Sequence, residues 1–174
     1  MLYKTTAALC ILVAQTFAAN AADGTITFDG ALITDGCKFV GDSSSTNKTV
    51  PMGTYNVTAL SKTGDSTPKK PVALTFEGCP SEFADINVGF SGSLNSNNPE
   101  FFEVKQGTNS IDGIGLSLTT EDNKALPPNT GVQISPDEDG NASLTVQANY
   151  IATANNTLTA GELASVVNVS ISYE

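Results

Sequence analysis

Three residue types with distinctive chemistry are missing from this chain, which contains no histidine, no tryptophan and no arginine. Without histidine there is no Ser-His-Asp or Cys-His catalytic arrangement and no zinc site that uses histidine. Without arginine, and with 18 acidic residues against eight lysines, the chain has poor means of binding a phosphate backbone. We therefore predict no catalytic residues, no metal, no cofactor and no nucleic-acid partner.

One acidic cluster superficially resembles a calcium-binding loop. It is the stretch Asp137-Glu138-Asp139-Gly140-Asn141. Its glycine stands at the fourth position of the loop rather than the sixth, and no glutamate stands at the twelfth. We interpret the cluster as an acidic turn, with a calcium loop as the alternative.

The chain also lacks an apolar run long enough to span a bilayer as a helix. Its first apolar stretch, Ala7 to Phe17, follows the basic start at Lys4 and precedes the small residues Ala19-Asn20-Ala21. This arrangement predicts a signal peptide over residues 1–21 and hence an exported protein. The mature part would keep seven lysines and 18 acidic residues, a formal charge of 7 − 18, or about −11.

Two cysteines remain after removal of the signal peptide, Cys37 and Cys79. A cysteine pair in an exported chain is most simply explained as one disulfide. The alternative is a redox or metal pair, but the two cysteines have no CxxC spacing and no histidine to accompany them.

Short alternating apolar runs, separated by Gly, Pro, Asn and Asp, dominate the mature sequence, with no long pattern at a helical period. The fold class is therefore predicted to be all-β, in one domain. The expected strands are Thr25 to Ile33, Thr49 to Val57, Val72 to Glu77, Ile86 to Ser91, Gly115 to Thr119, Ser143 to Ala152 and Ser165 to Tyr173.

The two ends of the mature chain carry the clearest alternation. At the end, Val167, Val169, Ile171 and Tyr173 face one way and the intervening residues face the other. At the start, the segment Gly24 to Leu32 places its apolar residues on one face as well. Alternation alone leaves open whether this first strand completes its own sandwich or another one.

The order of several motifs resembles the type 1 fimbrial pilins, which are assembled by a chaperone and an usher. The motifs are Thr25-Ile26-Thr27-Phe28-Asp29-Gly30, Thr49-Val50-Pro51-Met52-Gly53, Val72 through Cys79, Gly113 through Leu118 and Val146 through Thr153. Gly161, the fourteenth residue counting back from the end, and the penultimate Tyr173 resemble the chaperone-recognition pattern of this family.

The resemblance implies an immunoglobulin-like β-sandwich that lacks its last strand and receives a donor strand from another chain. Residues 22–36 would then form the N-terminal donor-strand extension and residues 37–174 the pilin domain. The donor side chains would be Ile26, Phe28 and Leu32, with Gly30 at a close backbone approach. The chaperone strand and the groove edge would involve Gly161, Val167, Val169, Ile171 and Tyr173.

The resemblance further implies a structural subunit of an adhesive surface pilus, or fimbria, polymerised by donor-strand exchange. Its partners would be neighbouring pilin subunits, a periplasmic chaperone and an outer-membrane usher, and the assembled fibre would meet host receptors. The chain would pass through the periplasm to the bacterial cell surface. The alternative is a self-contained secreted module that binds a carbohydrate or a receptor, which would need a complete sandwich in one chain.

Overall fold

The computed structural model describes residues 36–41, 47–155 and 158–173. The expected strand Thr25 to Ile33, and with it the predicted donor residues Ile26, Phe28, Gly30 and Leu32, lies outside this range. All described residues belong to one folded unit, Ile33–Glu174.

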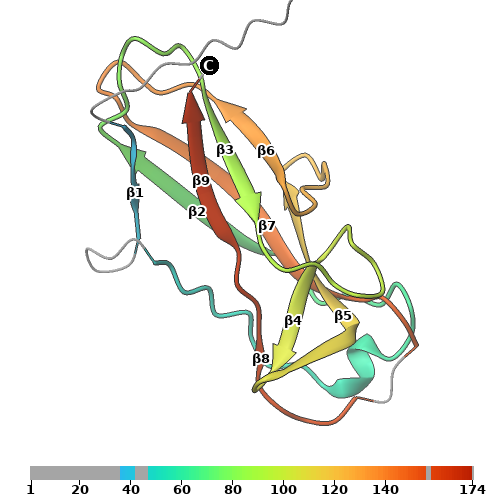
Figure 1. The fold of residues 1–174 in the computed structure, drawn as a ribbon. Helices are drawn as coiled ribbons and strands as arrows, with labels where there is room; N and C mark the ends of the chain where they lie inside the picture. Colours follow the sequence, from blue (N-terminus) through green and yellow to red (C-terminus); the bar gives the residue numbers. More distant parts are fainter. Residues whose placement is uncertain (1–35, 42–46, 156–157, 174) are drawn as a thin grey trace, which may run out of the picture. The chain divides into compact units, whose positions relative to one another are not determined.

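The described chain forms two antiparallel sheets (Figure 1). One sheet has six strands in the order β1-β2-β7-β5-β4-β8, and the other has three in the order β6-β3-β9. The strands are β1 (Lys38–Val40), β2 (Lys70–Glu77), β3 (Ile86–Ser91), β4 (Phe102–Gln106), β5 (Asn109–Thr120), β6 (Thr130–Ile134), β7 (Ala142–Ala152), β8 (Leu163–Ala164) and β9 (Asn168–Tyr173), and one short 3-10 helix, η2, spans Val57–Leu60. In this part of the chain no helix has the length and apolarity needed to cross a membrane.

Four expected strands are confirmed by β2, β3, β5 and β7, although β5 begins six residues earlier than the alternation indicated. The strands β1, β4 and β6 were not predicted, because each is only three to five residues long and too short to show a period.

The prediction of a strand over Thr49 to Val57 is wrong. The structure has no strand there, and the stretch ends in the 3-10 helix η2. Asn56 caps this helix, because its side-chain oxygen accepts a hydrogen bond from the Thr58 amide at 3.0 Å. A capping residue thus overrides the β-branched composition at the end of this segment.

The expected strand Ser165 to Tyr173 is confirmed over its last six residues, which form β9, whereas its first three residues lie between β8 and β9. β8 pairs with β4 of the six-stranded sheet, whereas β9 pairs with β3 of the three-stranded sheet. Between them, the Ser165 hydroxyl donates to the carbonyl of Glu103 at 2.5 Å. The last part of the chain therefore borders both layers of the sandwich.

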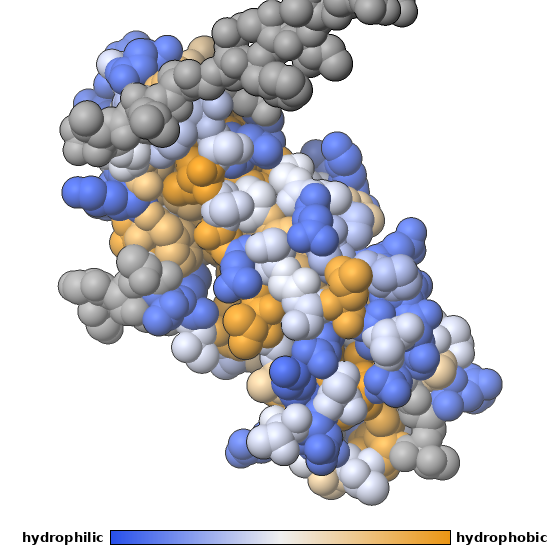
Figure 2. Space-filling model, in the orientation of Figure 1, coloured by the Kyte–Doolittle hydropathy of each residue, from blue (hydrophilic) through white to orange (hydrophobic). Residues whose placement is uncertain are grey.

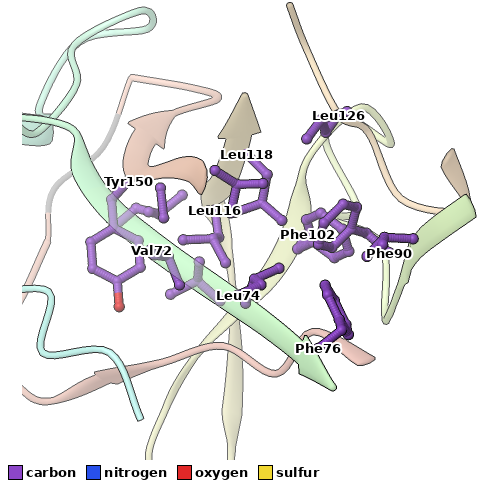
Figure 3. Close-up of a cluster of buried hydrophobic side chains, with 14 of the residues drawn as sticks. Val72, Leu74, Phe76, Phe90, Phe102, Leu116, Leu118, Leu126 and Tyr150 are labelled. Atoms are coloured by element: carbon purple, nitrogen blue, oxygen red, sulfur yellow. The ribbon is translucent and has the colours of Figure 1, made fainter. Parts of the chain in front are cut away.

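The hydrophobic core lies between the two sheets. β3 alternates strictly, so that Ile86, Val88 and Phe90 are at most 2% exposed. Phe76 of β2 and Phe102 of β4 are completely buried and meet this row from the six-stranded sheet (Figure 3). The alternation predicted from the sequence therefore identifies the inward faces of the long strands.

The predicted disulfide between Cys37 and Cys79 is present and joins residues 42 apart in sequence. It ties the start of β1 to the loop after β2. The amide of Cys79 also donates to the carbonyl of Gly140 at 2.9 Å, which fixes this loop to the β6–β7 connection.

Replacing Phe76 with alanine should lower the free energy of unfolding by about 3–5 kcal/mol, because the ring is fully buried and packs on Phe39 at 5.7 Å between centroids. Urea denaturation of the oxidised mature protein measures this loss. The control Thr75→Val changes the exposed neighbour in the same strand and should shift stability by no more than about 0.5 kcal/mol. Equal losses in the two variants would contradict this assignment of the core.

Candidate functional site: an apolar groove beside β9

A groove with a volume of about 1350 Å³ opens along the side of the sandwich. One wall is the extended segment 47–57, and the other is residues 158–169, which include β8 and the start of β9. Both walls are continuous stretches of chain, an arrangement that suits an extended peptide.

The floor of the groove is the hydrophobic core itself. Inward-facing residues of β2, β5 and β7 line it, and Phe90 of β3 joins them (Figure 3). These residues are Val72, Leu74, Ile114, Leu116, Leu118, Val146, Ala148 and Tyr150, none of them more than 8% exposed. An occupant of the groove would therefore lie directly against the core.

The rim of the groove leaves large apolar side chains uncovered. Val57 is 39% exposed on one wall, and Val166 is 74% exposed on the other. The space-filling view shows apolar residues at the surface between β1 and β9 (Figure 2). Exposed apolar surface of this kind commonly marks a site where another chain binds.

β9 is paired on one edge only among the described residues. Its six residues pair with β3 from Asn168↔Ser91 to Tyr173↔Ile86, and no described strand pairs with its other edge. Its inward residues Val169, Ile171 and Tyr173 are only half-buried, although those of β3 are almost fully buried. The partial burial of these three side chains and the edge that no described strand pairs together indicate that the described layer lacks one strand.

The structure places the predicted groove-edge residues in two groups. Gly161, Val167 and Val169 line the groove wall, whereas Ile171 and Tyr173 lie beyond the end of the lining. Sequence reasoning did not identify the opposite wall, 47–57, as part of the site. The alternation there had suggested an ordinary strand.

Gly161 lies where the wall passes close to β4. A side chain at this position would collide with Gln106, whose side-chain amide donates to the carbonyl of Thr159 at 3.2 Å. These contact atoms belong to the flexible Gln106 side chain, so a larger residue at this position would require that side chain to move.

Tyr173 lies at the end of β9, beyond the groove lining. Its hydroxyl accepts a hydrogen bond from the amide of Cys37 at 2.6 Å, and its ring packs on Phe83 with centroids 5.1 Å apart. The end of β9 is thereby held against the residues that lead into β1.

The groove carries little charge. Lys48 and Glu162 are the charged residues that line it, both on the walls. On the floor, burial raises the pKa of the Tyr150 phenol, and the nearby Tyr55 raises it further. Because burial in an apolar environment disfavours the phenolate, this site suits an uncharged, apolar occupant.

The acidic cluster at Asp137 has the geometry of a turn. One carboxylate oxygen of Asp137 accepts hydrogen bonds from the amides of Asp139 and Asn141, at 3.0 and 2.8 Å. Across the described ranges, no three acidic or cysteine side chains gather in a way that could hold a metal ion.

Comparison with known proteins shows to which family this chain belongs. The model of a family described as fimbrial protein matches residues 26–174. This chain belongs to the fimbrial protein family. Long polar fimbria protein A of Salmonella typhimurium is 29% identical over 96% of this chain and 93% of its own length, and a type-1 fimbrial protein subunit of Serratia marcescens is 28% identical over 96% of both chains.

A solved structure of a pilus subunit has the same fold. The P pilus rod subunit PapA superposes with a TM-score of 0.63 over 80% of this chain and 100% of its own, at 14% sequence identity. The predictions of a fimbrial pilin, of an incomplete immunoglobulin-like sandwich and of a structural subunit of a pilus are confirmed by these comparisons and by the fold. The family is one of structural subunits, and its fimbrial members place this pilin in a surface fimbrium.

Above pH 10, the mature protein should lose stability in part through Tyr150. The folded-state pKa of this phenol is raised, so its contribution to stability is complete below the unfolded pKa of about 10 and is lost as the pH rises through the folded value. In urea denaturation between pH 9 and 11.5, the free energy of unfolding should fall less with rising pH for Tyr150→Phe than for the unmodified protein. Tyr55→Phe should show most of the fall seen in the unmodified protein. Identical pH profiles for Tyr150→Phe and the unmodified protein would contradict the contribution assigned to Tyr150.

Proposed function

We propose that this pilin polymerises by donor-strand exchange, in which the segment Gly24 to Leu32 of a neighbouring copy fills the groove. The observation that carries the proposal is the edge of β9 that no described strand pairs, above an apolar floor, since this combination suits one more strand. The predicted donor side chains Ile26, Phe28 and Leu32 alternate as such a strand demands.

The energetics suit a fibre without covalent links. Burying three large apolar side chains contributes roughly 5–9 kcal/mol, as an upper value. Main-chain hydrogen bonds to the free edge of β9 add to this. They also require the whole strand to leave at once, which makes dissociation slow.

We assign Gly30 to a close approach between the donor backbone and the groove. It is the one glycine between Phe28 and Leu32 on the apolar face of the segment. A bulky side chain there would hold the strand away from the floor.

Before assembly, we propose that a periplasmic chaperone inserts a strand into the same groove and delivers the subunit to an outer-membrane usher. A groove whose rim exposes Val57 and Val166 would otherwise promote aggregation. The signal peptide over residues 1–21 would direct the export, and the assembled fibre would contact host receptors. No enzymatic role is proposed.

Removal of residues 22–33 should abolish assembly. Mature protein produced in an oxidising periplasm with its chaperone and usher should give a ladder of multimers on an unheated denaturing gel, and the truncated protein should give none. Gly30→Phe should give the same loss. A stable monomer whose core contains its own first strand, unable to complement a second copy, would instead support a self-contained binding module.

An acidic residue in the groove wall should block strand binding. Val169→Asp places an unpaired charge at a half-buried, inward-facing position, whereas Asn168→Asp adds the same charge to its exposed neighbour. We expect at least about a tenfold loss of multimers for Val169→Asp on the same gel, since leaving such a charge unpaired costs more than 1.4 kcal/mol. Equal effects of the two variants would show that β9 does not form the binding edge.

A further inference from the structure

The floor of the groove carries one polar side-chain group, the hydroxyl of Tyr150. Every other residue of this floor has a hydrocarbon side chain. Tyr150 is only 4% exposed, and its hydroxyl makes no hydrogen bond with another described residue. Its oxygen points away from the labelled core side chains (Figure 3). Because a hydroxyl that is taken out of water without a partner is costly, a strand that covers this floor should bring a partner for it.

The main chain of Tyr150 is held on both sides. Its amide donates to the Thr67 hydroxyl at 3.0 Å, and its carbonyl accepts a hydrogen bond from the Thr67 amide at 3.0 Å. On the other side, β7 pairs Tyr150 with Leu116 of β5. The phenol therefore rises from a fixed point of the six-stranded sheet, and its hydroxyl marks a defined position along the groove.

A second phenol of the groove, Tyr55 on the wall, already has a partner. Its hydroxyl donates to the carbonyl of Met52 at 2.8 Å, so its proton is used within the wall. Burial, and after it the nearby Tyr55, raises the pKa of the Tyr150 phenol. Tyr150 thus stays protonated at neutral pH and keeps a proton to donate to whatever fills the groove.

The donor strand of the proposed exchange can offer this proton only a main-chain acceptor. Its inward side chains, Ile26, Phe28 and Leu32, carry no polar atom. A main-chain carbonyl is most accessible at a glycine, where no side chain stands between the backbone and the floor. Tyr150 is also the largest side chain of the floor, so the strand needs its smallest residue opposite it. Gly30, between two large inward residues, meets both requirements.

We propose that the Tyr150 hydroxyl donates a hydrogen bond to the main-chain carbonyl of Gly30 in the strand that fills the groove, and so fixes the register of that strand. Alternation alone permits a slip of two residues, which keeps the apolar face inward. Such a slip would bring Phe28 or Leu32 against the phenol ring and leave the hydroxyl unpaired. Tyr150 is therefore a specificity-determining residue that selects a strand with glycine at this point. This inference rests on the proposed donor-strand exchange.

The test compares multimers of the mature chain with multimers of Tyr150→Phe, which keeps the ring and removes only the hydroxyl. The Tyr150→Phe multimers should dissociate in unheated detergent roughly fivefold faster, the effect of losing one hydrogen bond of ordinary strength. The matched control Tyr55→Phe loses a hydrogen bond made within the wall, and its multimers should dissociate at the unmodified rate. Equal rates for Tyr150→Phe and the unmodified protein would overturn the proposed hydrogen bond.

A second measurement locates the acceptor. In fibres whose glycine carbonyls carry an NMR-active carbon label, the Gly30 signal should move upfield in Tyr150→Phe and stay in place in Tyr55→Phe. A shift at Gly24 instead, or at neither glycine, would show that the register assignment is wrong while donor-strand exchange stands. A mature chain that forms no multimers at all, even with its chaperone and usher, would overturn the proposed exchange and this inference together.

Discussion

The free edge of β9 is the constraint on which the rest of this pilin depends. No described strand pairs with this edge, and a core floor that includes Val72, Leu74 and Leu116 lies beside it, so this layer has room for one more strand. The sandwich is otherwise well packed, with Phe76 and Phe102 fully buried. The incompleteness of the described sandwich is therefore confined to one side of the fold, and in the proposed donor-strand exchange a second chain completes it.

Several local features follow from this constraint. The chain passes from one sheet to the other between β8 and β9, so a single groove borders both layers. Gly161 lets its wall pass close to Gln106, and the hydrogen bond from the Cys37 amide to the Tyr173 hydroxyl holds the residues that lead into β1 beside the end of β9. The charge of the chain, −10 over the full sequence, lies largely outside the groove, where it favours solubility and leaves the groove suited to an apolar strand.

Much of this architecture could be predicted from the sequence, because β2, β3 and β7 alternate over six or more residues and each buries one face. The groove could not be located in the same way. Its wall at 47–57 has strand-like composition, yet no strand forms there, and Asn56 ends it with a helix cap. The contact of Tyr173 with Cys37 was also inaccessible, since it joins residues 136 apart in sequence. Periodicity identifies faces, whereas a contact between distant residues requires the fold.

The most direct test of this account is the structure of the assembled fibre at a resolution that identifies side chains. The account predicts an extended segment in the groove of each subunit, paired with the free edge of β9, with Ile26, Phe28 and Leu32 of the neighbouring subunit directed at the core and Gly30 between them. A groove filled by the subunit's own residues 24–32, or fibre contacts made elsewhere with the groove empty, would contradict it.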